Sequence, residues 1–341
     1  MRACVIHGAS DLRLEHRPDP SPGHGGVTVA VALGGICGSD LHYFHDGAVG
    51  SFVVREPLVP GHEIVGRIRA LGDGVVGPAP GTPVAVHPAT PCGACRECRE
   101  GRPNLCASVR YLGSAAQYPH VQGGLAEELV VRADQVRVLP DGLELERAVL
   151  AEPLSVALHA LRRAGAIAGR RVLVTGAGPI GLLAVALARR AGAAEIVSSD
   201  LVDAALERAA RLGATVTIRA DRTDAGGWPA EVDAAFEASG SQGGLSNCVE
   251  LVRPGGTVVM VGMPPATGLN LPAGRVVTRE LTLTGAFRIG GELEEALGLL
   301  AGGLDVDGVV SHVFPLAEAR AAFEIAGDRS VASKVLLQLA K

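Results

Sequence analysis

The sequence predicts an α/β protein in which a β-rich first part is followed by a doubly wound parallel sheet. The first 150 residues or so hold short valine-rich runs such as VTVAVALG, EIVGRIRAL and EELVVR, separated by glycine, proline and aspartate. Apolar runs of this length between turn formers are typical of strands. Beyond Glu152, apolar strands alternate with alanine-rich helices, as in RVLVTGAGPIGLLAVALARRAGAAEIVSSD. That alternation predicts parallel strands with helices packed against them.

We divide the chain into three segments on this basis. Residues 1–151 form the β-rich domain. Residues 152–286 form the parallel-sheet domain, which begins with the helical stretch PLSVALHALRRAG and continues through VDAAFEASG, LSNCVELV, TVVMVG and LTLTGAF. Residues 287–341 return to the first domain, with helices expected over residues 293–301 and 316–326 and a final strand in KVLLQLA.

The composition excludes several classes of function. The chain is 48% hydrophobic and 20% charged, and its 31 basic residues against 36 acidic ones give a net charge of −5. This balance argues against binding to nucleic acid or to an anionic membrane. The first twenty residues lack the apolar run of a signal peptide, and no apolar stretch is long enough to cross a bilayer. We therefore expect a cytoplasmic protein with neither nucleic acid nor membrane as a partner.

Four cysteines lie close together at Cys92, Cys95, Cys98 and Cys106. The spacing C-x2-C-x2-C-x7-C lets four thiolates reach one ion, and a tetrahedral set of four cysteines suits zinc. The surrounding loop, residues 88–108, has little apolar surface of its own and therefore needs a bound ion to stabilise it. The alternatives are a disulfide pair or a chance cluster, but low cysteine use without a signal peptide argues against disulfides. A closed four-cysteine site is structural rather than catalytic.

A dinucleotide site is indicated by Gly176, Gly178 and Gly181, which form G-x-G-x-x-G. The motif follows a predicted strand over residues 171–175 and opens a predicted helix over residues 179–190, the context that makes it specific. The glycines let the backbone approach a pyrophosphate, and the helix start offers free N–H groups. Asp200 ends the next strand and would bind the ribose hydroxyls, so we predict NAD over NADP. The alternative reading of Asp200 is a helix N-cap.

A second metal site is suggested by Cys37, in GGICGSDLHYFHDG, and His62, in PGHEIVG. Taken separately, a lone cysteine or histidine usually packs in a core. Together with one carboxylate, either Glu63 or Glu152, they would give the three protein ligands of a catalytic zinc. Such a zinc would lower the pKa of an alcohol so that hydride can leave its carbon. Glu152 has the easier approach, because adjacent residues on a strand point to opposite faces unless the backbone turns, as Gly61 permits.

The whole chain resembles the zinc-dependent medium-chain alcohol and polyol dehydrogenases. GHEIVGRIRALGDGV fits the zinc signature of that family, and the four-cysteine loop and GAGPIG match it in order and spacing. CGSDLHY, GHE and AEPLSVALHA are similar to the sorbitol dehydrogenase branch. Within that branch, GGICGSDLHYFHDGAVGSF, YLGSAAQYPHVQGG, LTGAFRIGGELEEAL and AGDRSVASKV resemble the enzymes that oxidise L-idonate.

The resemblance implies a GroES-like catalytic domain, a Rossmann domain, NAD, and two zinc ions per chain. It implies that Cys37, His62 and Glu63 hold the catalytic zinc and that Glu152 holds the water on it. Ser39 and His42 match a proton relay. Two residues, Tyr43 and Arg288, match substrate-pocket positions, and four match dinucleotide contacts, namely Ile180, Val261, Gly262 and Phe287.

Several alternatives remain at these positions. Ser39 is otherwise a turn hydroxyl, His42 an exposed loop histidine and Arg288 a surface ion-pair partner. Relatives often carry an arginine four or five residues after the ribose acid, where this chain has Ala204 and Ala205 and the nearest arginine is Arg208. This departure weakens the expected adenine contacts.

Three functions follow from these patterns: oxidation of the sugar acid L-idonate, oxidation of another polyol such as sorbitol or xylitol, or non-catalytic binding of zinc and NAD. An intact catalytic zinc set argues against the third. Arg288 and Arg55 are the candidates for holding a substrate carboxylate. LTLTGAF is expected to be the edge strand of the parallel sheet, and pairing with a second copy would protect that edge. We expect a homo-oligomer, as a tetramer.

Overall fold

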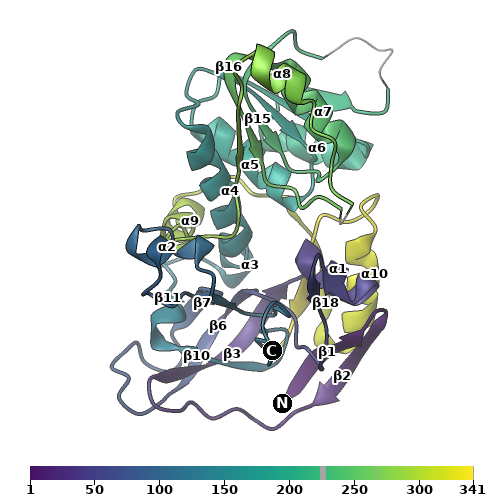
Figure 1. The fold of residues 1–341 in the computed structure, drawn as a ribbon. Coiled ribbons are helices and arrows are strands. Elements are labelled where there is room, and N and C mark those ends of the chain that lie inside the picture. The colour runs from purple at the N-terminus through teal and green to yellow at the C-terminus, as the bar shows by residue number, and fades with distance from the viewer. Residues whose placement is uncertain (223–227, 266, 341) are drawn as a thin grey trace.

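The computed structural model describes residues 1–222, 228–265 and 267–340 and has two lobes (Figure 1). The lower, β-rich lobe contains both ends of the described chain. The upper lobe contains a parallel sheet with helices on both faces. Helix α4 (Ala151–Ala164) enters the upper lobe from the lower one, and the segment after β17 (Thr282–Gly285) leads back.

The lower lobe is built on a seven-stranded sheet whose order is β11-β7-β6-β3-β19-β18, with β10 paired to β3. Its strands are β3 (Gly26–Gly35), β6 (Glu63–Leu71), β7 (Pro83–Val86), β10 (Glu128–Arg132), β11 (Val136–Val138), β18 (Val310–Pro315) and β19 (Lys334–Gln338). Valines alternate along β3, and Val27, Val29 and Val31 are buried in one cluster with residues of β6 and β19. The predicted final strand therefore completes the first sheet.

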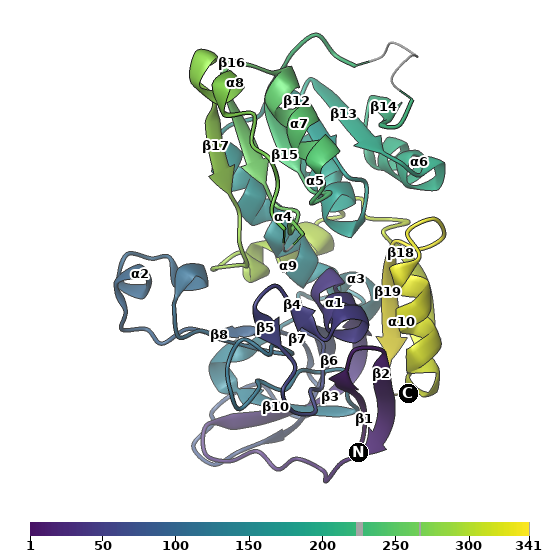
Figure 2. The same ribbon diagram turned by 45° about the vertical axis from the view of Figure 1, so that its right-hand side comes forward.

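Shorter elements surround this sheet. They are the hairpin β1 (Arg2–Gly8) and β2 (Asp11–His16), the pairs β4 (Ala48–Val49) with β5 (Phe52–Val53) and β8 (Ala89–Thr90) with β9 (Arg110–Tyr111), and the helices α1 (Gly38–Asp46), α2 (Arg96–Arg99), α3 (Leu145–Ala148) and α10 (Ala319–Gly327). Single 3-10 turns lie at Pro103–Leu105, Ala133–Gln135 and Leu316–Glu318. Figure 2 shows the loop with α2 projecting from the lobe.

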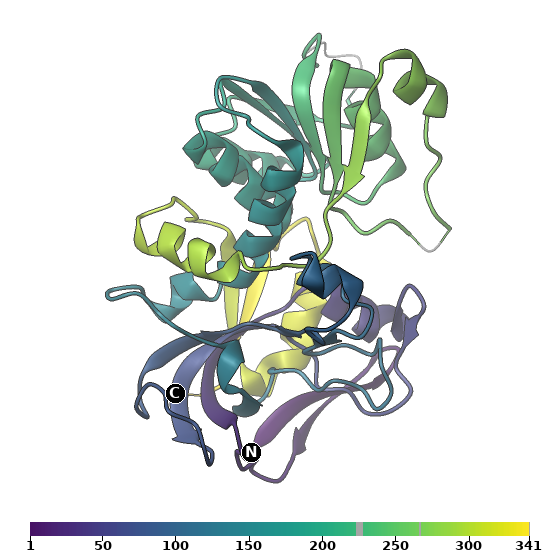
Figure 3. The same ribbon diagram turned by 60° about the vertical axis from the view of Figure 1, so that its left-hand side comes forward.

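The upper lobe confirms the predicted doubly wound sheet. Six parallel strands are ordered β14-β13-β12-β15-β16-β17. They are β14 (Val216–Arg219), β13 (Glu195–Asp200), β12 (Arg171–Thr175), β15 (Val232–Glu237), β16 (Val252–Met260) and β17. One apolar cluster joins the sheet to α4, α5 (Pro179–Arg190), α6 (Asp203–Leu212) and α9 (Leu293–Ala301). A second cluster joins its other face to α7 (Gln242–Leu251) and α8 (Ala273–Thr278) (Figure 3).

Two sequence expectations need correction. The first part of the chain was expected to contain only strands and turns, but residues 38–46 form helix α1. Its N-cap is Cys37, whose N–H is accepted by the side chain of Asp40, and this local bonding starts a helix that has no strong apolar pattern. The helix expected over residues 316–326 is divided into a 3-10 turn and α10. No helix among the described residues is long and apolar enough to cross a membrane.

Candidate active site

Cys37 is held in place at the start of α1 by a buried carboxylate. Asp40 has no exposed surface, and its Oδ2 accepts the N–H of Cys37 at 2.9 Å while its Oδ1 accepts the N–H of Gly61 at 3.1 Å. Cys37 is therefore fixed as the N-cap of α1. Asp40 ties this segment to the one that carries His62.

His62 and Glu63 follow a sharp turn. Gly61 has φ +95°, and a side chain there would place its Cβ 2.4 Å from Leu125. His62 lies just before β6 and Glu63 is its first residue, so the two side chains are not constrained to opposite faces of one strand. The backbone turn at Gly61, which would let Glu63 lie beside His62, is therefore present.

The structure brings Cys37, His62 and Glu63 together. One donor atom from each lies within 4.8 Å of the others, and His62 and Glu63 are buried. Within the described part of the chain, Nδ1 of His62 and Oε2 of Glu63 have no hydrogen-bond partner, although both atoms are buried. Unpaired buried polar atoms are costly, and a bound cation would remove that cost. A thiolate, an imidazole and a carboxylate are ligands that zinc accepts, so these residues fit a zinc ion.

Glu152 lies beside this cluster on α4, but it is bonded differently. Its Oε1 accepts the hydroxyl of Tyr111 at 2.8 Å. The ring of Tyr111 contacts the His62 ring edge-on, with centroids 5.4 Å apart, and the guanidinium of Arg288 lies 5.3 Å from the Tyr111 centroid. Tyr111 therefore contacts the Glu152 carboxylate, the His62 ring of the metal cluster and the guanidinium of Arg288.

Negative charge is concentrated around His62. Burial alone would lower its pKa, but Cys37, Asp40 and Glu152 outweigh burial and raise the pKa of His62 well above the ordinary value. Burial raises the pKa of Asp40, and His62 opposes that shift. Burial likewise raises the pKa of Glu152. A divalent cation at this cluster would supply countercharge to these buried acids.

The residues matched to a proton relay and a substrate pocket lie on or near α1. Ser39 is partly exposed in its first turn, and His42 is exposed with Nδ1 3.0 Å from Asp46. Tyr43 is buried, and its hydroxyl accepts the N–H of Ala115 at 3.0 Å. Ser39 and His42 are thus both accessible to some degree, whereas the hydroxyl of Tyr43 already accepts a backbone N–H.

Arg288 has an unusual conformation. Its φ is +58°, which is rare for a residue with a side chain. Its guanidinium lies between two rings, 4.6 Å from the centroid of Phe287 and 5.3 Å from that of Tyr111. Burial lowers the pKa of Arg288, and in the described part of the chain it forms no ion pair with a carboxylate. Arg55, the other candidate cation, is exposed and lies over the ring of Tyr118.

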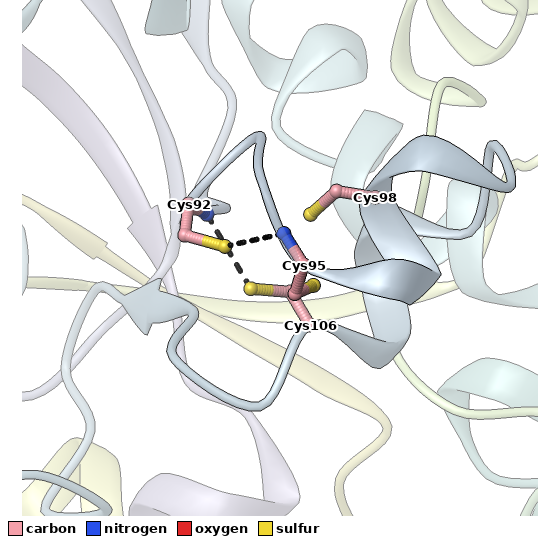
Figure 4. Close-up of side chains that lie close together, drawn as sticks. All are labelled: Cys92, Cys95, Cys98 and Cys106. Atoms are coloured by element: carbon pink, nitrogen blue, oxygen red, sulfur yellow. Dashed lines mark hydrogen bonds between the residues drawn. The ribbon is translucent and has the colours of Figure 1, made fainter.

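The four cysteines of the projecting loop also converge, as Figure 4 shows. Their sulfur atoms lie within 4.8 Å of one another, and all seven cysteines of the chain are free thiols. The N–H of Cys92 points to the sulfur of Cys106 and that of Cys95 to the sulfur of Cys92, both at 3.3 Å. Backbone N–H groups of Ala94 and Cys95 lower the pKa of Cys92 to about 6. Although the N–H of Cys98 opposes the shift, burial and the neighbouring sulfurs raise the pKa of Cys95 to about 12. The four sulfurs fit a zinc ion, whose binding would hold them as thiolates.

The glycine motif forms the turn between β12 and α5. Gly176 has φ +88°, and a Cβ on it would lie 2.7 Å from the backbone N of Ser239. A Cβ on Gly181 would lie 1.8 Å from the carbonyl oxygen of Gly176, whereas Gly178 has open space around it. Gly178 is the N-cap of α5, and Ile180 is partly exposed in its first turn. The open side at Gly178 fits the approach of a pyrophosphate.

Asp200 ends β13 beside this turn. Its Oδ2 accepts the N–H of Ala177 at 2.7 Å and its Oδ1 that of Val202 at 3.0 Å. The N–H groups of Val261 and Gly262, after β16, both bond the carbonyl of Glu237 at 2.8 Å. Phe287 is 43% exposed, although the guanidinium of Arg288 lies over its ring. These residues lie at the carboxyl ends of neighbouring parallel strands, where such sheets bind nucleotides.

Four residues that support the sites were missed in the sequence. Asp40, Tyr111 and Lys334 contact the metal cluster or Glu152, and Glu237 is a buried carboxylate that accepts the N–H groups of Ser239 and Gly240 at the dinucleotide turn. Asp40 could have been found from its capping position three residues after Cys37. The other three have no local signal in the sequence.

Comparison with known proteins gives consistent matches. Residues 23–141 match the alcohol dehydrogenase GroES-like domain, and residues 179–302 match the zinc-binding dehydrogenase family. The chain is 36% identical to L-idonate 5-dehydrogenase (NAD(P)(+)) of Escherichia coli K12, covering 98% of both chains. It is 36% identical to sorbitol dehydrogenase of Bacillus subtilis, covering 95% of this chain and 93% of that one. The crystal structure of L-idonate 5-dehydrogenase from Escherichia coli superposes with a TM-score of 0.93 at 34% identity, covering 99% and 98%.

Proposed function

The chain belongs to the family of zinc-binding, GroES-like alcohol and polyol dehydrogenases, and on that premise we propose that it transfers hydride reversibly between NAD and a secondary hydroxyl of a sugar acid, with L-idonate as its substrate. The observation that carries the proposal is the position of Arg288. This partly buried cation lies on the ring of Tyr111, whose hydroxyl bonds Glu152 beside the metal cluster. A carboxylate on the substrate would give Arg288 an ionic partner close to the reacting group.

Each group has a role in this proposal. Zinc held by Cys37, His62 and Glu63 would polarise the reacting hydroxyl and lower its pKa. Ser39 takes the proton of that hydroxyl, and His42, exposed at the surface of α1, passes it to solvent.

Two further groups position the reactants. Glu152, fixed by Tyr111, orients water at the metal site. The turn at Gly176 and the carboxylate of Asp200 position the NAD that accepts the hydride. The four cysteines hold a second, structural zinc.

Substrate choice is tested with a panel of sugar acids and polyols in the presence of NAD, followed by absorbance of the reduced cofactor. Arg288→Leu is compared with Arg55→Leu, which removes an exposed cation away from the cluster. We expect Arg288→Leu to lower kcat/KM for L-idonate by roughly 10- to 100-fold, the loss of one ionic hydrogen bond, and to leave oxidation of sorbitol and xylitol much less affected. Arg55→Leu should resemble the wild type.

The second candidate function is a polyol dehydrogenase of the sorbitol or xylitol type. The Bacillus subtilis sorbitol dehydrogenase supports it, because its identity to this chain equals that of the L-idonate enzyme. Equal loss on sorbitol and L-idonate in Arg288→Leu, or a wild-type preference for sorbitol, would favour it. No turnover by protein that holds both zinc and NAD would favour a binding protein instead.

The third zinc ligand is tested by metal content. We propose that Glu63 binds the metal directly, because one of its oxygens lies within 4.8 Å of donor atoms of Cys37 and His62, and that Glu152 does not, because among the described residues it is outside this close set. Glu63→Gln should lose zinc together with activity, and Glu152→Gln should keep most of its zinc and lose rate. Zinc loss in Glu152→Gln but not in Glu63→Gln would reverse the assignment.

We also propose a homo-oligomer of this chain, a tetramer, in the cytoplasm. Strand β17 is the edge of the parallel sheet, as the sequence predicted, and pairing with a second copy would cover it. Seven free thiols fit a reducing compartment. A monomer in light scattering at micromolar concentration would reject the oligomer.

A further inference from the structure

A lysine from the last strand holds the Glu63 carboxylate. Lys334 begins β19, is buried, and donates to Oε1 of Glu63 at 2.6 Å and to the carbonyl of Ile36 at 3.1 Å. Ile36 immediately precedes Cys37, so one ammonium group contacts both segments that supply donor atoms. We propose that Lys334 is the positioning residue of the catalytic metal site and presents a single oxygen of Glu63 to the metal. The inference rests on the proposed function, which assigns that site to Cys37, His62 and Glu63.

The strand register explains how the two residues meet. Glu63 on β6 lies opposite Gly35 on β3, and Gly35 is also paired with Leu336 on β19. A Cβ on Gly35 would lie 1.9 Å from Oε2 of Glu63 and 2.9 Å from its carboxyl carbon. The missing side chain at Gly35 therefore makes the space in which the Glu63 carboxylate extends across β3 to Lys334. With Oε1 bound to Lys334, Oε2 is the buried oxygen left without a partner.

The choice of lysine is unusual for this chain. Of its 31 basic residues, 29 are arginine, and Lys334 and Lys341 are the two lysines. A guanidinium forms a planar fork that binds both oxygens of a carboxylate, whereas an ammonium is a point charge that can bind one. Arginine at this position would compete with the metal for Oε2. Lysine neutralises part of the buried charge and leaves that oxygen available.

The test compares Lys334→Met, Lys334→Arg, Glu63→Gln and the double variant Lys334→Met/Glu63→Gln. Zinc affinity is measured by chelator competition on the full-length protein, and the cobalt-loaded protein gives a ligand-field spectrum of the site. The four-cysteine zinc is the internal reference, and thermal midpoints report folding. We expect Lys334→Met to weaken metal retention at the catalytic site by roughly 10- to 100-fold and to alter its cobalt spectrum, as losses of outer-sphere partners do. Lys334→Arg should fold but fail to restore either property.

The double variant tests whether Lys334 acts through Glu63. If it does, Lys334→Met adds no further metal loss on the Glu63→Gln background, and an additive loss would contradict the proposal. Because this variant leaves no unpaired buried carboxylate, it decides the question even where Lys334→Met does not fold. Wild-type affinity and spectrum in Lys334→Met, or full rescue by Lys334→Arg, would also overturn the role. Wild-type protein that binds metal only at the four cysteines would instead reject the proposed function.

Discussion

Glu292 makes folding sensitive to acid at the connection between the two lobes. Its Oε2 accepts the N–H of Gly290 at 2.6 Å, and its Oε1 lies 3.0 Å from Nδ1 of His159 and 3.2 Å from the guanidinium of Arg162. The carbonyl of Gly290 in turn contacts Nε2 of His87 at 2.9 Å. One buried carboxylate thus ties the segment that carries Arg288 to α4. We predict that Glu292→Gln, which imitates the protonated acid, loosens this connection at neutral pH.

The magnitude follows from the pKa. Burial would raise the pKa of Glu292, but the bonds from His159 and from the Gly290 N–H outweigh it and lower that pKa from 4.5 to about 2. A carboxyl whose pKa is lower in the folded state stabilises folding above its ordinary pKa, and this contribution is lost as pH falls from 4.5 towards 2. Discounted for the part of the carboxylate that solvent screens, the shift corresponds to roughly 1–2 kcal/mol of unfolding free energy at neutral pH. For a chain of this length that is about 2 °C in thermal midpoint.

The assay is a series of thermal unfolding curves for wild type and Glu292→Gln, from neutral pH down to about pH 3. We expect the variant to melt at a lower temperature at neutral pH and the two midpoints to converge on acidification. A difference that stays constant over this range, or grows as pH falls, would refute the linkage. A wild-type midpoint at neutral pH equal to that of the variant would show that the carboxylate charge contributes nothing.

Three further predictions concern zinc and cofactor. Cys98→Ser should reduce the zinc content from two ions per chain to one and lower the thermal midpoint, and unchanged stability would reject a structural zinc. Asp200→Ala should weaken NAD binding about tenfold or more and relieve the discrimination against NADP, measured by binding titrations with both cofactors. A wild-type preference for NADP would contradict that prediction. Gly181→Ala should abolish tight NADH binding, because its Cβ would lie 1.8 Å from the Gly176 carbonyl, whereas Gly298→Ala, at an exposed helical glycine with open space around it, is the matched control.

Much of the fold could be predicted because its signals are local. The strand over residues 171–175 and the helices over residues 179–190 and 293–301 have the bounds that the apolar pattern indicated. Helix α1 was missed because a cysteine N-cap and one aspartate start it, and its apolar residues, Tyr43 and Phe44 among them, are few. Hydrogen bonds at its N-terminus start α1, whereas a sequence prediction depends on a periodic pattern of apolar residues.

The candidate sites also divide into those with a local signal in the sequence and those without one. The four cysteines and the glycine turn lie within short segments, so their spacing indicated that they converge. Tyr111 and Lys334 could not be found, because sheet register and the packing of distant segments bring them to Glu152 and Glu63. Glu63 was predicted as a ligand from the family resemblance, and the turn at Gly61 shows how it can lie beside His62.

The contribution of β19 to the first sheet has a consequence for biosynthesis. During translation Glu63 emerges from the ribosome long before Lys334, because 271 residues separate the two. The whole parallel sheet is made in the interval, so the nucleotide-binding half can fold while the metal-binding half still lacks its central partner strand. The Glu63 carboxylate has no countercharge until β19 docks beside β3. Metal delivered to a nascent chain before β19 is made would therefore meet an unfinished site.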